Sequence, residues 1–225
     1  MQSRFSGTEI LDRDDVSESE LRASFGFMRM VNRFFGGTRA VLDYFSAHSL
    51  PSNFSVLDLG FGGGDIAYAL SAWAKAQGKQ AVITGVDINP FCVAFANEHF
   101  KAPSLRYFRA SAFDLGSLGE FDYIISSMFF HHLNNEEIVR LLRLMAKHAR
   151  RGFLVNDLYR SWPAYGGAVA LALPTFQGII LNDAPVSVKR AFKEEDFERY
   201  RDLAAIPSAK ISRKPVFRIT LSQHA

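Results

Sequence analysis

The chain has 225 residues, 48% of them hydrophobic, and its one cysteine is Cys92. This length suits a single domain with a sizeable core, and one thiol excludes both a disulfide framework and a multi-cysteine metal site. The formal net charge is +3 and the basic residues are scattered, so we expect no nucleic-acid partner. The acidic, polar N-terminal region is unlike a signal peptide, so we expect a cytoplasmic protein.

The first fifty residues predict an arm followed by a helical cap. Residues 1–16 predict a loosely ordered arm. Residues 17–20 (Ser-Glu-Ser-Glu) are a capping signal with acidic residues in the first turn, and they predict a helix that ends near Phe35. A pair of glycines interrupts this helix, and Thr38 then caps a second predicted helix over residues 39–48.

Residues 51–225 predict one α/β core. Predicted strands and helices alternate there, which is typical of a doubly wound parallel sheet. The strands are expected at residues 56–59, 81–87, 105–109, 123–127 and 152–157. The helices between them are expected at about 65–77, 90–100 and 135–148, and residues 209–221 predict a closing hairpin.

A glycine-rich turn follows the first predicted strand, in the sequence Val56-Leu-Asp-Leu-Gly-Phe-Gly-Gly-Gly-Asp65. Glycine lets the backbone turn sharply there and lets a ligand approach the backbone amides. A P-loop would end in Gly-Lys-Ser/Thr, and a dinucleotide fingerprint would place a third glycine where Asp65 stands. The carboxylate of Asp58 suits a ligand that carries an amino group. S-adenosylmethionine has that ammonium group, a sulfonium and no phosphate.

An acidic residue also ends the second predicted strand, where Asp87 precedes Ile-Asn-Pro. A carboxylate at this position can accept hydrogen bonds from both hydroxyl groups of a ribose. With these two motifs, the sequence resembles class I S-adenosylmethionine-dependent methyltransferases over roughly residues 30–222. It is most similar to members that methylate quinone precursors, phenols and aromatic polyketides. The matching residues are Asp58, Gly60, Gly62, Gly64 and Asp87.

The resemblance implies a Rossmann-like sheet of seven strands with an antiparallel C-terminal strand. It also implies N-terminal helices that lie over the cofactor and line the substrate side. Apolar area on these helices is a candidate homodimer surface. The cofactor it implies is S-adenosylmethionine, with S-adenosylhomocysteine as the product and with no metal. The residues expected to bind this cofactor are Asp58, Gly60, Gly62, Gly64, Asp87, Ile88, Ser111, Ala112, Phe113 and Ser127.

The adenine side departs from the family pattern. Members usually follow the third strand with Asp-Ala-x-x-Leu, whereas this chain has Ser111-Ala-Phe-Asp-Leu. Ser111 can accept a hydrogen bond from the adenine amino group without the help of charge, or Asp114 can substitute for it. The backbone N–H of Ala112 is expected at adenine N1, and Phe113 is expected beside the ring.

Two adjacent histidines follow the fourth predicted strand, and Asp157 ends the fifth. These strands are neighbours in the expected sheet, so His131 or His132 can meet Asp157 beside the transferred methyl group. A carboxylate would orient the imidazole and make it a stronger base. We favour His131 as the general base and Asp157 as its partner. The alternatives are His132 as the base, or histidines that only cap the next helix or shape the pocket.

Residues 161–182 contain no charged residue, but Pro174 and three glycines weaken them as a membrane span. We interpret them as a buried or pocket-capping helical insertion, with contact to a membrane surface as the alternative. Arg160 or Asn32 is expected to fix a polar end of the acceptor. The aromatic and apolar residues nearby predict a site for a flat hydrophobic acceptor. The substrate-binding candidates are Asn32, Phe35, Met128, Phe129, Tyr159, Trp162 and Tyr165.

These features together predict a methyltransferase of secondary metabolism. The expected acceptor is a small hydrophobic molecule, aromatic or polyketide-type, and the expected reaction is O-methylation of a phenolic hydroxyl. O-methylation is favoured because a His–Asp pair serves a weakly acidic phenol. The alternatives are C-methylation of a quinone-like ring, a non-catalytic S-adenosylmethionine-binding protein, and methylation of RNA or protein.

Overall fold

The computed structural model describes residue 1 and residues 3–13 and 15–224, and in this part of the chain seven strands form one sheet. The strand order is β3-β2-β1-β4-β5-β7-β6. The first five strands are parallel, and β7 runs antiparallel between β5 and β6. The predicted doubly wound sheet with an antiparallel C-terminal strand is therefore confirmed. The strands are β1 (Asn53–Leu59), β2 (Gln80–Asp87), β3 (Leu105–Arg109), β4 (Phe121–Ser127), β5 (Ala149–Leu158), β6 (Lys210–Lys214) and β7 (Arg218–His224).

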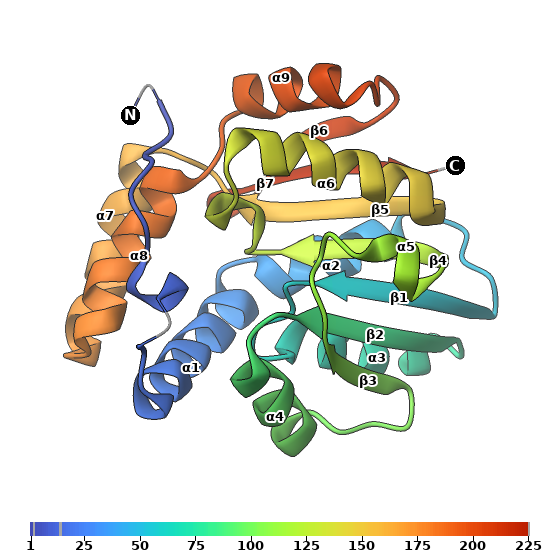
Figure 1. Cartoon of the computed structure of the whole chain (residues 1–225), viewed down its shortest axis with the longest axis horizontal. Helices are drawn as coiled ribbons and strands as arrows, with labels where there is room; N and C mark the ends of the chain where they lie inside the picture. Colours follow the sequence, from blue (N-terminus) through green and yellow to red (C-terminus); the bar gives the residue numbers. More distant parts are fainter. Residues whose placement is uncertain (2, 14, 225) are drawn as a thin grey trace.

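Helices cover both faces of the sheet, and others lie beyond the carboxyl ends of its parallel strands (Figure 1). The α-helices are α1 (Glu18–Phe34), α2 (Gly37–Ser46), α3 (Asp65–Ala76), α4 (Pro90–His99), α5 (Leu115–Leu118), α6 (Asn135–His148), α7 (Trp162–Ala172), α8 (Gly178–Arg190) and α9 (Glu194–Ala204). The short 3₁₀ helices within the described residues are η1 (Ile10–Asp12), η2 (Phe130–His132) and η3 (Leu173–Thr175).

The core lies on both sides of the sheet, because successive side chains of a strand point to opposite faces. Leu57 belongs to the cluster that includes Leu141 of α6, whereas its neighbour Val56 belongs to the cluster that includes Leu70 of α3. Strands that are buried on both faces have continuous apolar runs, which is the pattern that predicted them.

Local signals placed most helix ends correctly, and α2 is the exception. Helix α1 begins after Ser17, whose side chain accepts the backbone N–H of Glu20 in a capping box. Helix α2 begins at Gly37 and ends at Ser46, so the predicted range of 39–48 is displaced. The residue before it is Gly36, with a φ of 81°, and glycine adopts this left-handed conformation without strain. The turn is therefore made by Gly36 and not by a Thr38 cap.

The N-terminal segment and the insertion lie together beyond the carboxyl ends of the parallel strands. Figure 1 shows α1, α7 and α8 on this side of the molecule, with the N-terminal segment running along α8. The expectation of a loosely ordered arm is wrong for the described residues, because the backbone N–H of Phe5 donates to Lys189 and Asp183 binds two backbone N–H groups. The predicted insertion forms α7, η3 and the first turns of α8, and no helix among the described residues is long and apolar enough to cross a membrane.

Candidate active site

The glycine-rich turn connects β1 to α3 at the carboxyl edge of the sheet. Gly60 and Gly62 have φ values of 65° and 55°, which favour glycine. A Cβ on Gly60 would lie 2.5 Å from the ring of Phe129, whereas a Cβ on Gly62 would meet nothing within 4 Å. The turn is therefore closed against the loop after β4 and open beside Gly62, where a ligand can approach the backbone.

Two carboxyl groups flank this turn. Asp58 is 1% exposed, and its Oδ2 has no hydrogen-bond partner among the described residues. Burial, and then the nearby Asp65 and Asp87, raise the pKa of Asp58 well above its usual value. A cationic ligand group beside this carboxyl would favour its charged form. Asp87 accepts the backbone N–H groups of Gly62, at 3.1 Å, and Asn89, at 2.9 Å, and thereby ties the turn to the end of β2. The pair fits a cofactor that carries an ammonium group and a ribose.

The other predicted cofactor residues gather at the same edge of the sheet. The hydroxyl of Ser111 accepts the backbone N–H of Phe113 at 3.1 Å, so it shapes the turn after β3. Ala112 is buried between them, and Ile88 is exposed beyond the end of β2. Ser127, at the end of β4, accepts a hydrogen bond from the side-chain amide of Asn156 at 2.9 Å. Because β2, β3 and β4 are parallel strands of one sheet, the residues that follow their carboxyl ends lie at the same edge.

His131 and Asp157 form a buried pair. Nδ1 of His131 lies 2.7 Å from Oδ1 of Asp157, and Oδ2 accepts the backbone N–H of His131 at 3.1 Å. Burial by itself would raise the pKa of Asp157, but the charge and hydrogen bond of His131, together with the backbone N–H of Leu158 and the nearby His132, outweigh burial and lower this pKa. A carboxylate that accepts from Nδ1–H leaves Nε2 to accept a proton. The sequence predicted this contact.

His132 points to a different carboxylate. Its Nδ1 lies 2.6 Å from Oδ1 of Asp12, and Oδ2 of Asp12 accepts a hydrogen bond from Arg190 at 3.1 Å. The ion-paired Asp12 comes from the N-terminal segment, so His132 fastens that segment to the loop after β4.

Sequence reasoning missed a second carboxyl group beside His131. Glu9 is 3% exposed, and its Oε1 lies 3.5 Å from Nε2 of His131. Burial raises the pKa of Glu9 to about 7. The available signal was the run Glu9-Ile-Leu-Asp12, in which two carboxylates flank two apolar residues, but such a short unit has no periodicity.

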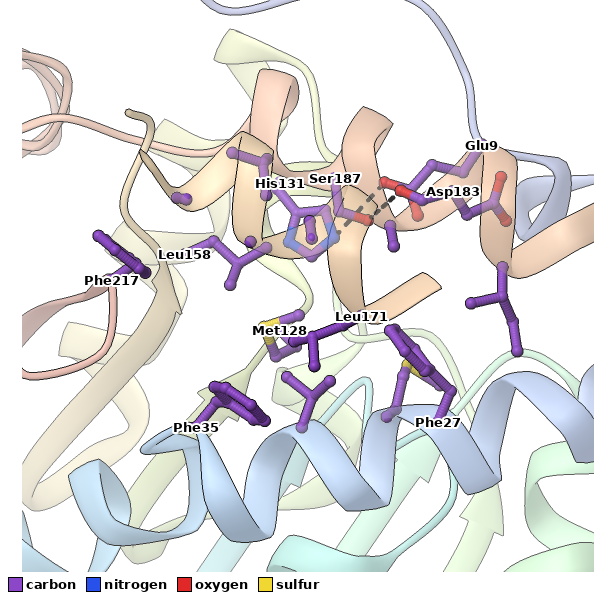
Figure 2. A pocket seen from close by; sticks show the side chains of 18 of the residues that line it. Glu9, Phe27, Phe35, Met128, His131, Leu158, Leu171, Asp183, Ser187 and Phe217 are labelled. Atoms are coloured by element: carbon purple, nitrogen blue, oxygen red, sulfur yellow. Dashed lines mark hydrogen bonds and ion pairs between the residues drawn. The ribbon is translucent and has the colours of Figure 1, made fainter. Parts of the chain in front are cut away.

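A cavity of about 180 Å³ lies against His131. Figure 2 shows Glu9, Asp183 and Ser187 gathered near His131 at one end, with Phe27 of α1 and Phe35, the residue that follows α1, on the opposite wall. Helices α1, α7 and α8 supply much of the lining, with apolar residues that include Met28, Val31, Ala164, Gly167, Ala168, Leu171, Ile180 and Val188. The cavity therefore offers an apolar volume with a few polar groups at one end, which is the pattern of a small-molecule site.

Two of the predicted acceptor residues, Phe35 and Met128, line this cavity. Asn32 does not, because its side-chain amide donates to Asp65 at the start of α3 at 3.1 Å. Phe129 packs over Gly60. Arg160, the other candidate for a polar contact, forms a 2.8 Å ion pair with Asp196 of α9.

The three remaining aromatic candidates lie outside the cavity lining. The ring of Tyr159 lies 4.3 Å from the guanidinium of Arg213, on the β6 side. Trp162 is 66% exposed at the start of α7 and meets Tyr165 edge to face. Trp162 and Tyr165 are three residues apart and pack on each other, whereas the residues of α7 that line the cavity are Ala164, Gly167, Ala168 and Leu171.

Arg218 is a cavity residue that the sequence analysis did not single out. It is 1% exposed, its Nε donates to the backbone carbonyl of Phe35 at 3.1 Å, and its Nη1 lies 2.6 Å from Sδ of Met128. Burial lowers the pKa of Arg218 to about 10. Arg218 thus connects two of the cavity walls, the end of α1 and the loop after β4.

Comparison with known families finds one match, to the model of a methyltransferase domain over residues 56–152. This segment begins in β1 and ends in β5, so it contains the glycine-rich turn, Asp87 and both histidines. No curated protein matches the sequence significantly.

Solved structures share the fold at low sequence identity. Human N-acetylserotonin methyltransferase in complex with S-adenosylmethionine aligns with a TM-score of 0.64 at 18% identity, covering 92% of this chain and 56% of that one. A candidate O-methyltransferase from Nostoc punctiforme gives 0.65 at 15% identity, covering 97% and 64%. Magnesium protoporphyrin IX methyltransferase from Synechocystis, with bound S-adenosylhomocysteine, gives 0.58 at 18% identity, covering 95% and 90%. The chain thus spans less than two thirds of the first two proteins.

Proposed function

We propose that this chain, whose residues 56–152 form a class I S-adenosylmethionine-dependent methyltransferase domain, methylates a phenolic hydroxyl of a small hydrophobic acceptor. The observation that carries the proposal is the His131–Asp157 pair at the wall of an apolar cavity. The pair lies at the carboxyl ends of β4 and β5, beside the edge that holds the glycine-rich turn.

The cofactor, when bound, supplies a methyl group on a positively charged sulfur. Asp58 would hold its ammonium group, Asp87 would hold the ribose hydroxyls, and Gly62 would let it approach the backbone. These roles agree with the unpartnered Oδ2 of Asp58 and with the open space beside Gly62.

The chain's own residues then prepare the acceptor. The apolar cavity walls exclude water and hold the acceptor ring, which raises the chance that its oxygen meets the methyl group in line. Nε2 of His131 takes the phenolic proton, and Asp157 keeps the imidazole in the tautomer that can do so. A phenol needs this help because its oxygen is a weak nucleophile while the proton remains.

The test is His131→Gln, assayed with isotope-labelled S-adenosylmethionine and a panel of phenols. We expect kcat to fall by about 10²-fold to 10⁴-fold, the usual contribution of a general base. The affinity for S-adenosylhomocysteine, measured by calorimetry, should stay unchanged. His99→Gln is the matched control, because His99 is exposed on α4 and remote from the cavity lining.

Two outcomes would argue for other functions. A ring-carbon product whose rate does not depend on His131 would indicate C-methylation of a quinone-like ring. Binding of the cofactor without a product from any acceptor would indicate a non-catalytic S-adenosylmethionine-binding protein.

A further inference from the structure

The N-terminal segment forms part of the wall around the candidate active site. Asp183 of α8 is buried, and its two carboxylate oxygens accept the backbone N–H groups of Ile10 and Leu11 at 2.8 and 2.9 Å. Arg4 donates to the backbone carbonyls of His131 and Leu133, at 3.3 and 3.2 Å. Contacts on both sides of residues 5–9 thus fix this stretch over η2.

Fixing the segment in this way places the side chain of Glu9 in the cavity lining. Figure 2 shows Glu9 pointing toward His131 across the polar end of the cavity. Its Oε1 lies 3.5 Å from Nε2 of His131 and has no hydrogen-bond partner among the described residues. Its only charged neighbours within ion-pair range among the described residues are His131 and, at 4.0 Å, Arg190. A buried carboxylate oxygen without a hydrogen bond is costly, so it points to a ligand group or a proton that completes the site.

The contacts of His131 place its imidazole ring between two carboxyl groups. Asp157 binds Nδ1 of His131, and Glu9 faces Nε2 on the other side of the ring. A hydroxyl group that donates to Nε2 would therefore come within reach of Glu9 as well. The charged or titratable groups that face Glu9 are His131 and His132 of η2, Asp12 of its own segment, and Asp183 and Arg190 of α8.

We propose that Glu9 is a catalytic residue that receives the acceptor's proton from Nε2 of His131. This inference rests on the proposed function, and it makes residues 3–12 a part of the catalytic unit and not an appendage to it.

The proposed step balances in atoms and charge. The phenolic O–H bond breaks and its proton moves to Nε2, while an oxygen lone pair forms the new O–C bond to the methyl group. The S–C bond breaks, and its electron pair stays on sulfur to give a neutral thioether. The proton then moves from Nε2 to Oε1 of Glu9, which leaves His131 neutral and Glu9 as a carboxylic acid. Glu9 releases the proton to water when the product leaves.

The environment of Glu9 agrees with this role. Burial raises its pKa to about 7, which is near the value at which a group both accepts and releases protons efficiently at neutral pH. An ordinary surface glutamate would be too weak a base to draw a proton from an imidazolium.

The experiment compares Glu9→Gln and Glu9→Asp with wild type at several pH values. We expect kcat of Glu9→Gln to fall by about 10²-fold with the affinity for S-adenosylhomocysteine unchanged. The acidic limb of its kcat profile should move to lower pH, because the proton shared by Glu9 and His131 loses the stabilising carboxylate of Glu9. Glu9→Asp should restore part of the rate, and Glu18→Gln, an exposed carboxylate on α1, is the control that should behave as wild type.

The double variant Glu9→Gln, His131→Gln separates this inference from the proposed function. If Glu9 acts through His131, the double variant is no slower than His131→Gln alone. A full rate for Glu9→Gln, or additive losses in the double variant, would overturn the role of Glu9 and leave His131 in place. A full rate for His131→Gln would overturn the proposed function itself.

Two further outcomes would assign a different role to Glu9. A loss of rate with an unmoved acidic limb, together with a lower midpoint of urea unfolding, would mean that Glu9 only holds the segment. Glu9, His131 and His132 also place potential ligand atoms within 4.8 Å of one another. Loss of wild-type activity in a chelator, with recovery on adding a divalent metal, would therefore assign the cluster to a metal and overturn the proposal.

Discussion

Three buried carboxyl groups of the site have different pKa shifts, because their neighbours differ. Asp157 has a lowered pKa because the contact with His131 outweighs burial. Burial raises the pKa of Glu9 to about 7, and burial together with the nearby Asp65 and Asp87 raises the pKa of Asp58 well above its usual value. Under the proposed function, carboxyl groups would therefore supply a fixed anion, a proton acceptor and a binding group for a cationic ligand within one site.

The raised pKa of Glu9 predicts a pH dependence of stability. Its usual pKa is 4.5 and its pKa in the fold is about 7, so the folded protein binds this proton more tightly than the unfolded chain does. The stabilisation is present below pH 4.5 and is lost as the pH rises through about 7. Over this range we expect the free energy of unfolding to fall on the order of 3 kcal/mol more in wild type than in Glu9→Gln.

Urea unfolding at several pH values measures this difference. Glu18→Gln should follow wild type throughout. Parallel pH dependences of wild type and Glu9→Gln would show that Glu9 titrates normally in the fold.

At the scale of the elements, α7 and α8 give the cavity its shape together with α1. Their shared apolar cluster contains Ala172, Ile179 and Ile180, and Ile10 and Phe27 pack against it. The small residues of α7 face the cavity, and their size leaves the volume for an acceptor. Under the proposed function, the insertion would therefore determine which acceptor fits, and the carboxyl edge of the sheet would determine where the cofactor lies.

Filling the cavity from α7 should separate these two roles. Ala168→Trp places a large ring in the cavity lining, so we expect the acceptor KM to rise at least about tenfold, the effect of about 1.4 kcal/mol in binding. The affinity for S-adenosylhomocysteine should stay unchanged. Ala170→Trp, on the exposed side of the same helix, is the control. Equal KM values for both variants would mean that the acceptor binds elsewhere.

At the scale of the whole molecule, the strand order creates the cofactor crevice. Chain order reverses beside β1, which pairs with β2 on one side and β4 on the other. The loops after β1 and β4 therefore diverge at the carboxyl edge and leave space between them. Asp58 and Asp87 stand on adjacent strands at this edge, so the cofactor would link separate parts of the sheet.

Cofactor binding should consequently stabilise the entire fold. At a concentration of S-adenosylhomocysteine 100 times its Kd, the free energy of unfolding should rise by about 2.7 kcal/mol. Asp87→Asn should lose most of this gain at the same concentration. Asp43→Asn, which removes an exposed carboxylate from α2, should keep it. Thermal unfolding with and without the ligand gives the comparison, and an equal gain in Asp87→Asn would remove Asp87 from the cofactor site.

The sequence by itself determined the features that depend on local physics. Periodic apolar runs and capping residues such as Ser17 located the strands and most helices, because hydrogen bonds within one or two turns fix those ends. The motifs in these elements carried the resemblance to a family, the resemblance implied the strand order, and that order brings His131 to Asp157.

The tertiary structure alone decided which side chains complete the site. Glu9 and Asp12 reach the histidines across more than one hundred residues of chain, and no periodicity marks such a contact. Asn32 and Arg160 were predicted to face the acceptor, but each is satisfied by a nearby carboxylate, Asp65 or Asp196, in the packed fold. A sequence shows that a polar side chain is available. Its partner depends on which groups share a desolvated volume, because a buried polar group binds the acceptor or donor that packing places beside it.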